Sequence, residues 1–208
     1  MRSTSRFAYG LLAMLMGACS SGSIAFNPAP LDQLTRLERD RPLPPGYDLV
    51  AEGRLSIRGS RDQGTANFIL YLSPQASLIR LRHPLGPSMA EALLEDRGLT
   101  LYLPREKSTQ FMQAHPLFPQ RLPPRILRQI LWGGGLEQSP QWKQRGASWE
   151  WEGLSLRYQL KDRQGQPRKI RLEAGGYRLI LLVRKLKVGR LSALELSPEG
   201  KKALAAAP

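Results

Sequence analysis

The chain of 208 residues has little cysteine and histidine, and each shortage excludes a class of site. One cysteine, Cys19, allows neither an intramolecular disulfide nor a cysteine metal site. The two histidines, His83 and His115, each precede a proline, which favours a turn or surface position over catalysis. A Ser-His-Asp set, metal-ligand spacing and a phosphate-binding glycine loop are also missing. We therefore expect no enzyme, no cofactor and no bound metal.

Acidic residues are scarce as well, because 31 Lys and Arg face 17 Asp and Glu and leave a net charge of +14. Such a surplus suits a nucleic acid, an anionic membrane surface or an acidic protein partner, or it is simply a solvated basic surface. The export signal described next argues against nucleic acid.

Residues 1–18 have the pattern of an export signal. Arg2 and Arg6 supply a positive start without an acid, and residues 7–16 form an apolar run. That run is too short to cross a bilayer as a stable helix.

Cys19 follows two small residues and resembles the lipobox cysteine of bacterial lipoproteins. Met16 departs from the pattern, which usually has leucine three residues before the cysteine. We expect cleavage before Cys19 and acylation of the new terminus, with a plain secretory signal or an uncleaved anchor as the alternative. By resemblance to enteric lipoproteins, Ser20 points to the outer membrane instead of inner-membrane retention.

The remainder is predicted to be one domain, residues 47–197, between two simpler segments. Residues 20–30 are rich in Ser, Gly, Asn and Pro and suggest a flexible tether, followed within 19–46 by a short helix at 31–40. The Ala- and Lys-rich tail, 198–208, is expected to be frayed.

Apolar residues alternate with polar ones along most of the domain, which predicts β-strands. Turn residues separate the runs, as in an antiparallel meander. The expected strands lie at 54–58, 66–72, 78–82, 88–95, 99–103, 149–151, 154–160, 169–174 and 177–188. Trp149 and Trp151 share one face at strand spacing, which favours a core position over a ligand platform.

Two helices are predicted to interrupt the strands, a weak one at 105–114 and a better one at 125–132 after Pro124. The fold class is then α+β: a single curved antiparallel sheet of about 10–11 strands, an incomplete β-barrel, with two or three helices covering its apolar face. The pattern leaves open whether that face encloses a cavity or is packed solid.

The segment Pro84, Leu85 and Gly86 joins two apolar strands. Flanking prolines stiffen it, and Gly86 permits unusual backbone angles. Leu85 either folds back on the core, which the pattern alone favours, or stands exposed and enters a bilayer or grips an acyl chain.

The order of these parts resembles the LolB family of outer-membrane lipoprotein receptors. The matching parts are the lipobox cysteine, the strand GRLSIRG, the strand running into the Pro-Leu-Gly loop, the helix segment LRQIL followed by glycine, and the strand pair RKIRLEAGGYRLILL. The resemblance covers nearly the whole mature chain. The RLPP-containing insert and the high positive charge depart from it.

The resemblance implies a receptor that accepts acylated lipoproteins from a LolA-like periplasmic carrier and inserts them into the outer membrane, without nucleic acid and as a monomer. It implies lipid attachment at Cys19 and a membrane-inserting leucine at Leu85. Strand parity together with the resemblance predicts an acyl-chain cavity, whose lining residues are Leu55, Ile57, Phe68, Leu70, Leu101, Ile126, Ile130, Leu156, Tyr158, Ile170 and Leu172. The alternative is a lipid-anchored envelope-binding protein with a basic surface and a packed core.

Overall fold

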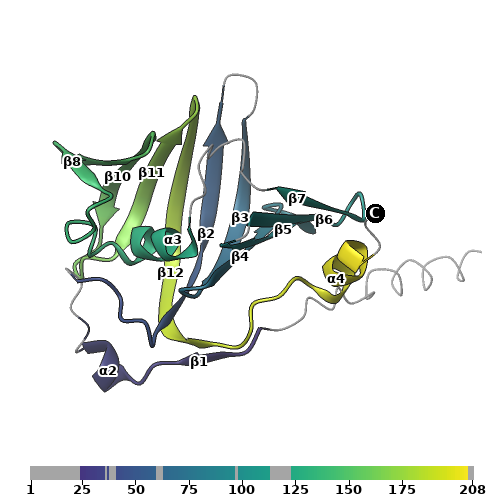
Figure 1. Cartoon of the computed structure of the whole chain (residues 1–208), viewed down its shortest axis with the longest axis horizontal. Helices are drawn as coiled ribbons and strands as arrows, with labels where there is room; N and C mark the ends of the chain where they lie inside the picture. Colours follow the sequence, from purple (N-terminus) through teal and green to yellow (C-terminus); the bar gives the residue numbers. More distant parts are fainter. Residues whose placement is uncertain are drawn as a thin grey trace, which may run out of the picture.

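The computed structural model describes residues 24–35, 37, 41–59, 63–96, 98–112 and 123–205. Cys19 and His115 lie outside these ranges. The described chain forms a 12-stranded antiparallel sheet and three helices (Figure 1). The sheet does not close into a barrel, so the expected α+β class with a single curved antiparallel sheet is confirmed.

The elements follow one another in a nearly simple meander. The strands are β1 (Phe26–Pro28), β2 (Asp48–Arg58), β3 (Gln63–Leu72), β4 (Ala76–Arg82), β5 (Ser88–Glu95), β6 (Gly98–Leu103), β7 (Ser108–Met112), β8 (Lys143–Arg145), β9 (Ser148–Trp151), β10 (Leu154–Lys161), β11 (Pro167–Ala174) and β12 (Tyr177–Leu191). The helices are α2 (Leu31–Thr35), α3 (Pro124–Trp132) and α4 (Pro198–Ala205). None of these described helices is long and apolar enough to cross a membrane.

The strand order is β7-β6-β5-β4-β3-β2-β12-β11-β10-β9-β8, with β1 added beside β12. The last strand thus pairs with the first long one, and β7 and β8 form the two edges. Leu55 on β2 lies opposite Leu181 on β12 and Ala66 on β3, so the apolar positions of neighbouring strands fall on one face. We call this face the inner face and its opposite the outer face.

The main core lies between the inner face and α3. Helix α3 follows Pro123 and ends at Gly133, whose backbone is left-handed at φ 85°. Its buried side chains, among them Ile126 and Ile130, pack with Phe68 and Leu70 of β3 in one hydrophobic cluster. In Figure 1, α3 lies across the curve of the sheet, in front of the strands that it covers.

A second, smaller core lies on the outer face, where the sequence pattern predicted none. Leu78, Tyr102 and Leu196 form it, and helix α4 packs against β6 and β7. A buried carboxylate joins the parts, since Glu91 accepts a hydrogen bond from the Ser197 backbone N–H at 2.8 Å and lies 3.5 Å from the Arg80 guanidinium.

Three local expectations are corrected by the structure. Residues 108–112 form strand β7, not part of a helix at 105–114, because their backbone completes the sheet beside β6. Residues 198–205 form α4 and are not frayed, because Leu196 and Gly200 are buried on the outer face. Residues 26–28 are not free tether, because they pair as β1 with residues 189–191 of β12.

Candidate functional site

The loop between β4 and β5 holds Leu85 out into solvent. The Leu85 side chain is 93% exposed. Its backbone N–H donates to Nδ1 of His83 at 3.2 Å, and the Gly86 N–H donates to the His83 carbonyl oxygen at 3.2 Å. The loop is closed by a bond from the His83 N–H to the Pro87 carbonyl at 3.1 Å. His83 therefore organises a tight loop with Leu85 at its tip. Because the Leu85 side chain is exposed, it does not fold back onto the core, although the sequence pattern alone favoured that position.

Most of the predicted cavity residues come together in the main core. Leu156 and Ile170 are 0% exposed. The buried members of the predicted set are Phe68, Leu70, Ile126, Ile130, Leu156, Ile170 and Leu172. The members on strands line the inner face, and Ile126 and Ile130 belong to helix α3, which covers that face.

The other predicted cavity residues remain partly accessible. Leu55, Ile57 and Tyr158 are half-buried and pack at the margin of the main core. Leu101 is also half-buried on the inner face, opposite Ala92, but lies outside the cluster. Strand parity therefore predicts correctly on which face of the sheet these four residues lie. Their degree of burial depends on the segments that pack over that face.

Hydrogen bonds from three polar side chains hold α3 against the inner face and the segment before β2. The Trp132 indole N–H donates to the Arg41 carbonyl at 2.8 Å. The Arg128 guanidinium donates to the carbonyl oxygens of Pro44 and Tyr47. The Tyr158 hydroxyl donates to the Ile130 carbonyl at 2.9 Å. These bonds explain how a short helix with a strongly apolar face keeps one position over the sheet.

Burial changes the acid–base behaviour of two groups in this contact. It raises the pKa of the Tyr158 phenol far above its usual range, and it lowers the pKa of the Arg128 guanidinium, which the nearby Asp48 carboxylate partly opposes. Both groups act as hydrogen-bond donors to backbone carbonyls. Their contacts are those of structural residues, not of a catalytic pair.

The two tryptophans singled out from the sequence occupy the core. Trp151 is buried and Trp149 is half-buried against the same cluster. Trp142 packs beside Trp151 with ring centroids 6.0 Å apart. The sequence predicts that strands return at Gln141, but clear alternation is confined to Trp149 and Trp151, so it does not assign Trp142 to the core. In the described chain no group of three His, Cys, Asp or Glu side chains could hold a metal.

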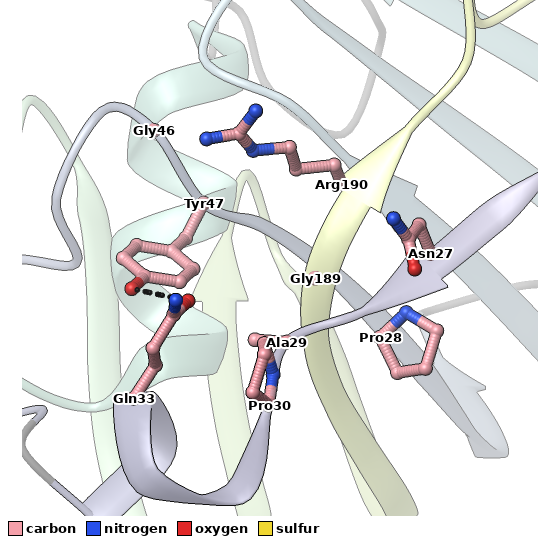
Figure 2. A pocket seen from close by; sticks show the side chains of 9 residues that line it. All are labelled: Asn27, Pro28, Ala29, Pro30, Gln33, Gly46, Tyr47, Gly189 and Arg190. Atoms are coloured by element: carbon pink, nitrogen blue, oxygen red, sulfur yellow. Dashed lines mark hydrogen bonds between the residues drawn. The ribbon is translucent and has the colours of Figure 1, made fainter.

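A shallow hollow of about 360 Å³ lies elsewhere, where the N-terminal segment meets the end of β12. Figure 2 shows that β1 and α2 form one wall of it, with Tyr47 and Arg190 on the other. The Tyr47 hydroxyl reaches across to the Gln33 side-chain oxygen at 3.2 Å. The hollow contains none of the residues predicted for a site.

No family model matches the chain, and no curated protein matches it. Among solved structures it is similar to a DUF1329 family protein from Desulfovibrio piger, with a TM-score of 0.44 and 13% identity over 67% of this chain and 84% of that chain. It is also similar to a LolA superfamily protein from Nitrosomonas europaea, with a TM-score of 0.40 and 8% identity over 76% of this chain and 90% of that chain. At these scores neither likeness assigns a family or a function to the chain.

Proposed function

We propose that this protein is a lipid-anchored receptor that accepts acylated lipoproteins from a periplasmic carrier and delivers them to the outer membrane. The observation that carries the proposal is Leu85, an apolar side chain 93% exposed at the tip of an internally bonded loop. An isolated exposed leucine in a preformed loop suits insertion among lipid acyl chains, because its burial there is favourable and the loop loses little freedom.

The apolar inner face supplies the second part of the proposed function. Acyl chains gain about 0.8 kcal/mol for each CH₂ removed from water, so a lipoprotein in transit needs a continuous apolar surface. The half-buried residues Leu55, Ile57 and Leu101 offer the accessible start of such a surface. A chain that reaches Leu156 or Ile170 has to displace side chains of the main core, since both residues are 0% exposed within it.

Export and acylation at Cys19 are part of the proposal and rest on the sequence pattern of residues 1–19. The transfer itself involves no covalent chemistry. It proceeds downhill if carrier, receptor and membrane bind the acyl chains with increasing affinity, so it needs no nucleotide.

Delivery to membranes tests the role of Leu85. Leu85→Glu places a charge where the leucine would enter the bilayer, so we expect a loss of lipoprotein transfer to outer-membrane vesicles with client binding retained. Leu204→Glu is the matched control, because Leu204 is 42% exposed on α4 and lies away from the loop. Equal transfer by the two variants would remove Leu85 from the mechanism.

Binding of a fluorescent acyl probe tests the inner face. The chain without residues 1–19 should bind the probe saturably, and Leu55→Gln with Ile57→Gln should weaken binding while the far-UV circular dichroism stays unchanged. These two positions are preferable to Leu156, whose replacement by a polar residue would disrupt the fold. No binding by the folded protein would favour the alternative, a packed envelope-binding lipoprotein.

A further inference from the structure

Many of the positively charged side chains that give the chain its net charge lie on the outer face of the sheet. Exposed or half-exposed cations on β2, β10, β11 and β12 define what we call the basic outer surface: Arg54, Arg58, Arg157, Lys169, Lys185 and Lys187. Register puts like charges side by side, since Arg58 lies directly opposite Arg178, and Arg157 directly opposite Arg171. Such cross-strand pairs of like charge destabilise a sheet.

Two carboxylates within this surface do not neutralise it, because each of the two is shared by two cations. Glu173 accepts hydrogen bonds from Arg171 at 2.6 Å and from Arg178 at 2.7 Å. Glu52 lies 3.8 Å from both Lys185 and Lys187. The surface therefore keeps a positive surplus on both sides of β12, and a sheet that tolerates the repulsion indicates an external anionic partner.

An apolar position lies among these cations. Leu182 on β12 is 39% exposed, with Lys169 opposite it on β11 and Arg54 opposite it on β2. An apolar side chain flanked by cations matches the interface of a bilayer, where phosphates lie above acyl chains. An acidic protein would match the charges as well, but it would not account for the Leu85 loop.

The Leu85 loop is continuous with this surface. Arg82, the last residue of β4, lies opposite Asn67, which lies opposite Arg54. Arg82 directly precedes the loop, and like Arg54 it belongs to the outer face. This end of the sheet thus carries Arg82, Arg54 and the exposed leucine, and Lys185 and Lys187 continue the basic outer surface toward the other end.

The N-terminal segment leaves from the other end of the strands. Pro28 of β1 lies opposite Gly189, which lies opposite Asp48, six residues along β2 from Arg54. Allowing for the overhang of β1 and of the loop, Leu85 and Ile24 are separated by on the order of 30 Å. The chain from Cys19 to Ile24 spans at most about 18 Å.

We propose that the basic outer surface docks on an anionic bilayer, with the strands running along the membrane. This inference rests on the proposed lipid anchor and Leu85 insertion for its orientation. If β1 stays paired, a short linker at one end and a leucine at the other reach one bilayer only when the sheet lies along it. The outer face carries the cations, so it faces the headgroups.

Vesicle binding by the chain without residues 1–19 tests the surface without anchor or client. We expect binding to phosphatidylcholine vesicles that contain phosphatidylglycerol, weak binding to pure phosphatidylcholine, and loss of binding at high salt. Arg54→Gln with Lys169→Gln, which flank Leu182, should weaken binding about tenfold or more. Arg125→Gln with Lys161→Gln removes the same charge from exposed positions on α3 and on the side of the sheet that α3 covers, where Lys161 donates to the Gly133 carbonyl, and should leave binding nearly unchanged.

Orientation is tested with a polarity-sensitive fluorophore on single cysteines introduced at Leu182 or at Arg125, which is exposed on α3 over the inner face. Anionic vesicles should shift the emission of the label at 182 to the blue and leave the label at 125 unaffected. Equal binding to neutral and anionic vesicles, or equal losses in the two charge variants, would overturn the proposal and favour an acidic protein as the partner. Acyl-probe binding is measured separately, so its failure would count against the receptor function and not against this surface.

Discussion

At the scale of single residues, one polar side chain can hold a whole turn in place. Asp162 accepts hydrogen bonds from the backbone N–H groups of Gln164 and Gln166, each at 2.9 Å, and its carboxylate lies 2.8 Å from the Arg168 guanidinium. These contacts close the hairpin between β10 and β11. Partial burial opposes ionisation, but the bonds from Gln166, Gln164 and Arg168 outweigh it and lower the pKa of Asp162 below its usual value.

The sign of this shift predicts a pH effect on stability. A carboxyl whose pKa is lower in the folded state stabilises the protein above its unfolded pKa, near 4 for Asp, and that contribution is lost as the pH falls through the folded value. Asp162→Asn should therefore lower the free energy of unfolding at pH 6, and the difference from wild type should shrink as the pH falls toward 3. Urea denaturation at several pH values measures this. A difference that stays constant with pH would show that the ionised form does not matter.

At the scale of elements, β1 shows how a short strand can be held by one neighbour alone. Its residues lie beside the end of β12, and the bonds from Ala29 N–H to the Val188 carbonyl at 2.9 Å and from Ser192 N–H to the Ala25 carbonyl at 3.0 Å extend the pairing. Ile24 before the strand packs against the smaller core, and Ala29 after it packs against the main core. Gly189 makes the approach possible, because a Cβ there would lie 2.2 Å from the Asn27 carbonyl oxygen.

Gly189→Val should consequently displace β1 while the rest of the sheet stays folded. The Cβ of a side chain at 189 would also lie 2.7 Å from the Phe26 ring. Hydrogen exchange should show lost protection at residues 25–29 and preserved protection in β2 and β3.

Gly64→Ala is the control for this variant, since the added Cβ meets only the Ile57 side chain at 3.7 Å. Unchanged protection at residues 25–29 in Gly189→Val would mean that β1 tolerates the side chain and that the contact at Gly189 does not hold it.

At the scale of the whole molecule, an open sheet has two edges that another chain could extend. One edge, β8, is three residues long and exposed, and it carries Lys143 and Arg145. Short charged edges oppose pairing between molecules. The other edge, β7, is contacted by α4. Both edges are thus built in a way that favours the expected monomer.

Lys143→Val with Arg145→Val should make the protein self-associate, because the charges that oppose edge pairing are replaced by residues that favour strands. Sedimentation velocity should show dimers or larger species at concentrations where wild type is monomeric. Lys202→Val with Arg125→Val, at exposed helical positions, removes equal charge and should stay monomeric. Self-association by both pairs would assign the effect to net charge instead of the edge.

Local patterns in the sequence are enough to define most strands, the face that each apolar residue takes and the main helix. Alternation with a period of two assigns side chains to faces wherever one face is buried. Strand parity together with the resemblance groups Leu55, Leu156 and Ile170, and in the folded chain all three belong to one hydrophobic cluster. Pro124 and Gly133 mark the start and end of α3 for equally local reasons.

What covers each face is set by tertiary contacts alone. Local sequence does not show that residues 26–28 pair with β12, that residues 108–112 extend the sheet, or that Glu91 accepts a bond from Ser197 and secures the tail on the outer face. Each of these features depends on contacts between segments that are distant in the chain. A local sequence pattern does not reveal how favourable such contacts are. The exposure of Leu85 belongs with them, because the pattern allowed two positions and the folded loop holds one.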